Sequence, residues 1–180
     1  RMGFDFLAET MPELQAPLQP VPEWQVLMEL ELPLGMAPEA VMAGLYQGAA
    51  GAGLVTDGVI ATSGAQAAGL WQLREAIPLA NRKIGAVSSH DISLPLSAIP
   101  EFIERAPGVI APLGAFRVNC FGHLGDGNLH WNVFPARGET AARHESVRGK
   151  VKDLVYGLVH AFGGSIEAQH GRGREKVDDI

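Results

Sequence analysis

A two-residue turn signal constrains the fold of this chain more than any other feature. Asp126-Gly127 stands between two stretches, residues 114–123 and 128–134, in which apolar and polar side chains tend to alternate. Asp-Gly between such stretches is typical of a tight β-hairpin in which both turn residues take positive φ. We therefore predict two antiparallel strands joined at this turn.

The predicted hairpin brings two histidines together. If Asp126 and Gly127 form the whole loop, His123 faces His130 directly, with Cβ atoms about 4.5–5.5 Å apart. Two imidazoles held in this way can bind one metal ion. On the residues alone, a metal site and a structural histidine pair are equally open. For Asn128 and Asn132, turn capping or solvent exposure is the default interpretation.

Alternation also predicts what each face of the hairpin carries. One face is polar and rich in nitrogen, and the other is apolar and expected to be core. The polar face comprises Arg117, Asn119, Phe121, His123, Asn128, His130 and Asn132, and the apolar face comprises Val118, Cys120, Leu129, Trp131 and Val133.

Hydrophobic periodicity predicts the order β-α-β-α-β-α-β-β-α-β for the chain. The predicted strands cover residues 23–32, 54–61, 91–97, 114–123, 128–134 and 165–169, and the predicted helices cover 38–50, 63–81, 100–105 and 140–162. We expect an α+β fold, an antiparallel sheet with helices on one side, built from ferredoxin-like β-α-β halves. Four prolines between positions 12 and 22 predict that residues 1–22 form a lead-in segment rather than a packed element, followed by one domain over 23–180.

Charge and composition narrow the function classes. The formal net charge is −6, which argues against a nucleic-acid-binding surface. No apolar run approaches the roughly 20 residues of a membrane span. The single cysteine suits a reducing compartment, so we expect a cytoplasmic protein. The start at Arg1 and the stop after a glycine-rich, charged stretch suggest a fragment.

Two further segments carry candidate functional residues. His170 ends a short predicted strand bounded by glycines and could act as a base, although a strand end followed by a flexible basic loop is the preferred interpretation from the residues alone. Arg74 could bind a carboxylate through its guanidinium group, although a solvated helix face is favoured for Arg74 and Glu75.

Four strings in order along the chain resemble one known family. They are LWQLREAIP (70–78), SHDISLPLSAIPEFI (89–103), FGHLGDGNLHWNV (121–133) and GGSIEAQHGRGREK (163–176). Together they resemble the C-terminal domain of FAD-linked oxidases of the vanillyl-alcohol-oxidase type, in particular the D-lactate, glycolate and D-2-hydroxyglutarate dehydrogenase group. The resemblance covers nearly the whole chain.

The resemblance implies a cap domain that lies over an FAD held mainly by an N-terminal domain absent from this chain. It implies that His123 and His130 bind a divalent metal ion, that Arg74 and Asn132 bind substrate, and that His170 is the catalytic base. We assign Asn128 to contact with the cofactor.

Two positions depart from the family pattern. Gln169 stands where the family has an acid as the third metal ligand, and Ser89 stands where the family often has a lysine that contacts the substrate. A neutral amide is a weaker ligand than a carboxylate for a hard dication, so we expect Zn²⁺ or Mn²⁺ to be held weakly. Glu167, two residues earlier, is an alternative acid. Loss of the lysine argues against a dicarboxylate substrate.

These observations leave three functional hypotheses. The leading one is a flavin-dependent dehydrogenase that oxidises a small D-2-hydroxy acid, with this chain alone colourless and inactive. The others are a non-catalytic module that binds a metal or carboxylate and a degenerate oxidase domain of the same fold. A homodimer is left open.

Overall fold

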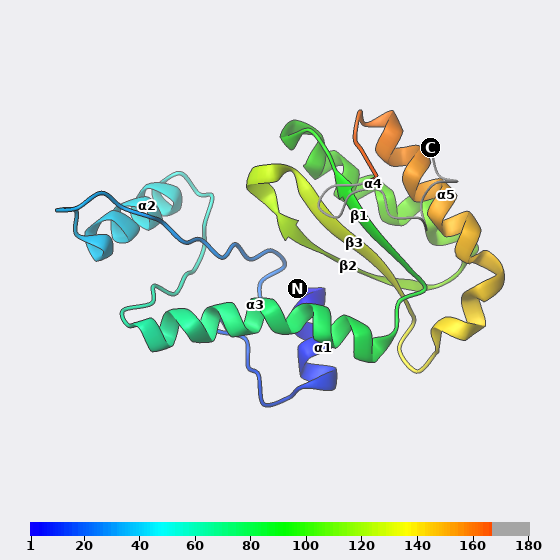
Figure 1. The fold of residues 1–180 in the computed structure, drawn as a ribbon, viewed down its shortest axis with the longest axis horizontal. Coiled ribbons are helices and arrows are strands. Elements are labelled where there is room, and N and C mark those ends of the chain that lie inside the picture. The colour runs from blue at the N-terminus through cyan, green and yellow to red at the C-terminus, as the bar shows by residue number, and fades with distance from the viewer. Residues whose placement is uncertain (167–180) are drawn as a thin grey trace. The chain divides into compact units, whose positions relative to one another are not determined.

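The structure, a computed structural model, describes residues 1–166 and consists of two compact units, residues 3–80 and residues from 81 onward (Figure 1). The first unit is helical. It contains α1 (Met2–Thr10), α2 (Pro38–Gly51) and most of α3 (Gly64–Ile84). Proline in the first turn starts α2, where its missing N–H is not needed. Gly85, with φ of +82°, follows the end of α3.

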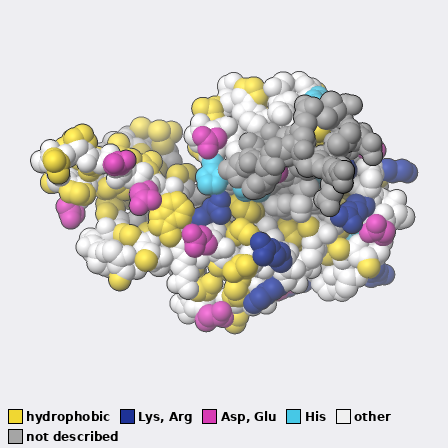
Figure 2. Space-filling view, in the orientation of Figure 1, with side chains coloured by type: hydrophobic (Ala, Val, Ile, Leu, Met, Phe, Trp, Pro, Cys, Tyr) yellow, Lys and Arg dark blue, Asp and Glu magenta, His cyan; other side chains and the backbone are white. Residues whose placement is uncertain are grey.

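Two strands predicted in the first unit are not formed. Residues 23–32 and 54–61 have no regular secondary structure, and no strand occurs among residues 3–80. Their large apolar side chains lie largely in solvent, with Trp24 59% and Val26 75% exposed, and Figure 2 shows hydrophobic side chains on the surface where α2 lies. An extended segment becomes a strand only beside another strand that pairs with its backbone, and none is present here.

The first ten residues also differ from the prediction of an unpacked lead-in segment. They form α1, in which Phe6 and Leu7 are fully buried. The prolines that suggested an irregular segment begin at Pro12, after α1 has ended, so they do not interrupt this helix.

The second unit contains the sheet. Its elements are β1 (Ser88–Ser93), α4 (Ile99–Ile110), β2 (Phe116–His123), β3 (Asn128–Pro135) and α5 (Glu145–Ala161). The three strands are antiparallel in the order β1-β3-β2, and Ser165 forms an antiparallel bridge to Ser93 at the outer edge of β1. This β-α-β-β-α order is that of a ferredoxin-like unit. It corresponds to one of the ferredoxin-like halves predicted for the domain.

One face of the sheet packs against α4 and α5 (Figure 1). Trp131 and Val133 of β3 are fully buried there, with Ile92 of β1, Phe102 of α4 and Val155 of α5. The structure thus confirms an α+β fold with an antiparallel sheet and helices on one side, and it confirms the predicted apolar face. No second ferredoxin-like half occurs among residues 1–166.

Element boundaries in this unit differ modestly from the predictions. β1 begins earlier than predicted, at Ser88, and it ends at Ser93 because Pro95 and a 3-10 turn at Leu96–Ala98 follow it. α4 extends to Ile110, past Arg105. A 3-10 turn at Ala141–His144 precedes α5. No helix in the described part of the chain combines the length and the apolar character that a membrane span needs.

Candidate functional site

The β2–β3 hairpin has a longer loop than its Asp-Gly signal predicts. His123 pairs with Asn128, and four residues, Leu124 to Gly127, form the loop. Gly127 has φ of +68° and its N–H donates to the Leu124 carbonyl over 3.0 Å, whereas no residue other than glycine has positive φ in the described chain. A 3-10 turn followed by a left-handed glycine therefore replaces the predicted two-residue turn.

The predicted direct pairing of His123 with His130 is therefore wrong. His130 pairs with Phe121, and His123 is its diagonal neighbour. The register is shifted by two residues, and because side chains alternate with a period of two, each side chain keeps its predicted face. The two rings still lie close together, with centroids 6.3 Å apart and planes at 82°.

The polar face of the sheet includes residues from all three strands. The register pairs Asn119 of β2 with Asn132, and pairs Ser89, Asp91 and Ser93 of β1 with Asn132, His130 and Asn128 in turn. Asn128 and Asn132 are buried, 1% and 8% exposed. They are therefore not solvent-exposed turn residues, which was their default interpretation.

Asp91 belongs to this face and was not predicted as a site residue. Its Oδ1 accepts a 2.7 Å hydrogen bond from Asn128 Nδ2 and lies 3.5 Å from His130 Nδ1. The alternation of side chains in β1 places Asp91 on the face that points away from the core. Predicting that Asp91 lies beside His130 would also have required knowing that β1 pairs with β3. That pairing joins segments nearly 40 residues apart and carries no local sequence signal.

The histidine pair supplies part of a metal site. Imidazole nitrogens are suitable ligands for Zn²⁺ and similar ions, and His123 and His130 lie on one face within reach of each other. Within residues 1–166, no group of three His, Cys, Asp or Glu side chains is arranged to hold a metal ion. The donor set thus fits half of a divalent site, and the predicted third ligand, Gln169, lies outside the described residues, as do Glu167 and His170.

Arg74 lies on α3 in the first unit and is partly buried. Burial lowers the pKa of its guanidinium group, and the neighbouring Glu75 partly opposes this effect. An arginine remains protonated at any physiological pH, so Arg74 offers a permanent positive charge for a carboxylate. Whether it shares a cavity with His123 and His130 stays a prediction.

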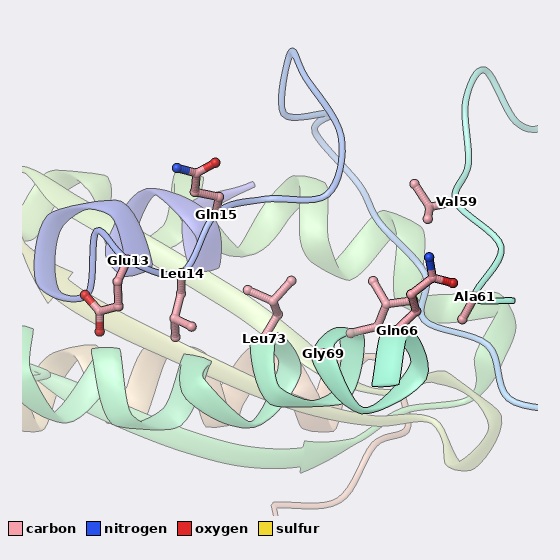
Figure 3. Close-up of a pocket in the computed structure, with 9 residues that line it drawn as sticks. Glu13, Leu14, Gln15, Val59, Ala61, Gln66, Gly69 and Leu73 are labelled. Carbon is pink, nitrogen blue, oxygen red and sulfur yellow. The ribbon is translucent and has the colours of Figure 1, made fainter. Parts of the chain in front are cut away.

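A shallow hollow in the first unit is a poor alternative site. It has a volume of about 330 Å³ and is lined mainly by apolar side chains, with Glu13, Gln15 and Gln66 as its polar ones. Figure 3 shows it between the segment after α1 and the first half of α3. It contains no histidine and no cation, so it lacks the groups that would bind a carboxylate or activate a hydroxyl.

Comparison with known proteins identifies the class of domain to which this sheet and its polar hairpin belong. The family described as FAD linked oxidases, C-terminal domain, matches residues 5–179. The chain belongs to this family of FAD-linked oxidase C-terminal domains.

Similar proteins carry consistent names. The chain is 39% identical over 128 residues to the D-2-hydroxyglutarate dehydrogenase, mitochondrial, of Arabidopsis thaliana, with 71% of this chain and 22% of the relative covered. It is 37% identical over 128 residues, with the same coverage, to a probable D-2-hydroxyglutarate dehydrogenase, mitochondrial, of Oryza sativa subsp. indica. It is 35% identical over 163 residues to the D-2-hydroxyglutarate dehydrogenase of Xanthomonas citri pv. viticola, with 90% of this chain and 34% of the relative covered. The chain thus spans between about a fifth and a third of these relatives.

Proposed function

We propose that the protein oxidises a D-2-hydroxy acid to the 2-oxo acid, using an FAD that is held mainly outside this chain. The observation that carries the proposal is the polar sheet face, on which His123, His130 and Asn132 lie together in a domain of the FAD-linked oxidase family. The partners implied are a small hydroxy-acid substrate and the flavin domain of the same protein.

The residues take distinct roles in this proposal. Arg74 and Asn132 bind and orient the substrate carboxylate, and His170 accepts the hydroxyl proton as the α-hydrogen leaves as hydride. His123 and His130, with Gln169 as a weak third ligand, would hold a divalent ion, which would lower the pKa of the substrate hydroxyl. A bound flavin would supply the redox chemistry by accepting the hydride, and Asn128 is the residue assigned to contact with it.

The substrate class follows from the relatives with one modification. The relatives named above act, by name, on D-2-hydroxyglutarate, a dicarboxylate. Position 89 of this chain is an exposed serine opposite Asn132 in the sheet register. A serine supplies no charge for a second carboxylate, so we propose that this enzyme accepts hydroxy acids that have only one.

One competing function has a specific observation in its favour. Only two imidazoles of a metal site are present among residues 1–166, and position 169 is a neutral glutamine. A degenerate or non-catalytic module that binds a carboxylate or a metal would fit these facts as well. In either case we propose a cytoplasmic location, and we leave a homodimer open.

Turnover of single enantiomers by the intact flavin-containing protein separates these functions. We expect oxidation of a D-2-hydroxy acid, no oxidation of its L-enantiomer, and a loss of roughly 10²–10⁴-fold in turnover for His170→Ala, as for a lost general base. His160→Ala is the matched control, because this histidine is exposed near the end of α5. Saturable binding of a D-hydroxy acid without turnover would favour the non-catalytic module, and normal turnover in His170→Ala would remove this residue from the mechanism.

A further inference from the structure

We infer that Asp91 is a positioning residue that fixes the ring of His130 with Nδ1 protonated, so that its Nε2 lone pair is the one presented to a ligand. The inference deepens the proposed function, on which it rests, and it assigns a role to a residue outside the predicted site.

The sheet register places Asp91 for this role. β1 is an edge strand of the three-stranded sheet, and its alternate residues Ser88, His90 and Ile92 are buried on the core face. Asp91 therefore points to the opposite, polar face, where it lies directly across from His130. Both side chains are largely shielded from solvent, with 17% and 21% of their surface exposed, so the interaction between them is only partly screened.

Two neighbours of Asp91 among the described residues contact the same carboxylate oxygen. Its Oδ1 lies 3.5 Å from His130 Nδ1 and accepts the 2.7 Å hydrogen bond from Asn128. The Asn128 amide nitrogen also lies 3.2 Å from the Ile92 carbonyl oxygen. Two acceptors around that nitrogen determine which way the amide faces. Asn128, in turn, pairs with His123 across the hairpin. The Asp91 carboxylate therefore contacts His130 directly, and it contacts Asn128, which lies beside His123.

A carboxylate beside Nδ1 has a definite chemical consequence. It stabilises the tautomer that carries the proton on Nδ1, and the other ring nitrogen then carries the lone pair. Metal-binding histidines commonly have a carboxylate in this position, which orients the ring and increases its basicity. Asp91 is better suited to this role than to direct ligation, because the described residues include no three-ligand cluster.

The test compares Asp91→Asn with Asp126→Asn in the 180-residue chain. Both variants remove one negative charge, but Asp126 is exposed in the hairpin loop, away from His130 in the register. Long-range ¹H–¹⁵N NMR reports the tautomer of each imidazole, and the His130 signals are assigned by their loss in His130→Gln. Titration with Co²⁺ reports metal affinity independently of activity.

We expect the wild-type chain and Asp126→Asn to show His130 with the proton on Nδ1. Asp91→Asn should populate the other tautomer and bind Co²⁺ about 10–100-fold more weakly, as when the outer partner of a metal ligand is lost. An unchanged His130 tautomer in folded Asp91→Asn would overturn the inference. A wild-type His130 with its proton on Nε2 at neutral pH would overturn it whether or not the variant folds.

The two readouts keep this inference distinct from the proposed function. A tautomer that depends on Asp91 in a chain that binds no Co²⁺ would support the positioning role and contradict the metal site. If both histidines bind Co²⁺ but the His130 tautomer is the same in Asp91→Asn as in the wild type, only the positioning role is contradicted.

Discussion

At the scale of single residues, the polar sheet face is held by hydrogen bonds within the second unit. Asn119 donates to Asn81 over 2.8 Å, Arg117 donates through Nε to the Pro135 carbonyl over 2.9 Å, and Asn128 donates to Asp91. Buried polar groups need such bonds, because an unsatisfied one costs roughly 1–3 kcal/mol. Hydrogen bonds within the chain itself thus fix part of this face, as a binding site requires.

Ser89 lies where a substitution would test the proposed choice of substrate. Ser89→Lys would place a cation on the polar face opposite Asn132. We expect the KM of the intact enzyme for a dicarboxylic D-2-hydroxy acid to fall about tenfold, as for a gained charge-assisted hydrogen bond, with little change for a monocarboxylic one. Ser97→Lys, at an exposed position after β1, is the control for added charge. Equal effects of both variants on both substrates would show that Ser89 does not face the substrate.

Cys120 provides a test of the core face of β2 through its pKa. Burial raises the pKa of the Cys120 thiol to about 12, against about 8.5 in an unfolded chain. The folded thiol should react with a disulfide reagent at pH 8 about 10³-fold more slowly than the unfolded one, because the thiolate is the nucleophile. Rapid reaction in the folded chain would contradict the packing of this partly buried side chain against the core.

The same pKa difference has a consequence for stability. The unfolded thiol loses its proton first, so the contribution of Cys120 is fully present below about pH 8.5 and is lost as the pH rises toward 12. The free energy of unfolding should therefore fall more steeply above pH 8.5 in the wild type than in Cys120→Ala. Denaturant titrations of the two proteins at several pH values measure this difference. If the free energy of unfolding falls equally with pH in both, the contribution assigned to Cys120 is contradicted.

At the scale of elements, the hairpin shows how far local sequence determines the site. The Asp126-Gly127 signal correctly predicts the hairpin and the face of each side chain, because both follow from the period of two. It does not predict the register, because loop length depends on whether Leu124 and Gly125 join the turn or the strands. The Asp91 contact is beyond local sequence altogether, since it depends on the pairing of β1 with β3.

The strands predicted over 23–32 and 54–61 are not formed, which shows again that local sequence does not determine strand pairing. Their composition favours extended structure, but pairing is a property of neighbouring strands rather than of the segment itself. The helices α2 and α3 were predicted within a few residues, because helical hydrogen bonds form within the segment.

Gly127 is an element-scale position at which a substitution should have a large effect. Its φ of +68° is unfavourable for residues with a Cβ, and an added Cβ would overlap the Leu94 carbonyl oxygen. The carbonyl of Gly127 also accepts a 3.0 Å hydrogen bond from the Leu94 N–H, which joins the hairpin loop to the end of β1. We expect Gly127→Ala to lower the free energy of unfolding by about 2–5 kcal/mol.

Gly125→Ala is the matched control for that substitution. This glycine lies two residues earlier in the same loop, has no positive φ, and an added Cβ would meet no atom within 4 Å. Chemical denaturation should show a change within about 1 kcal/mol for Gly125→Ala. Similar losses for both variants would contradict the loop conformation described for residues 124–127.

At the scale of the whole molecule, the chain belongs to the C-terminal domain family of FAD-linked oxidases and spans a fifth to a third of its named relatives. Oxidation of a hydroxy acid needs a hydride acceptor, which in this family is an FAD, and the named relatives extend well beyond the part that this chain matches. The chemistry assigned to the polar face therefore has to be tested in the intact, flavin-containing protein, whereas its geometry can be tested in this chain.

Anaerobic reduction of the bound flavin tests the central claim most directly. The intact protein is mixed with each enantiomer of a 2-hydroxy acid without any electron acceptor, and loss of the visible flavin absorbance is followed in time. We predict that the D-enantiomer bleaches the flavin, that the L-enantiomer does not, and that His123→Ala and His130→Ala each slow the bleaching at least about tenfold. Bleaching at the wild-type rate in both histidine variants, or none with any D-2-hydroxy acid, would contradict the role proposed for this face of the sheet.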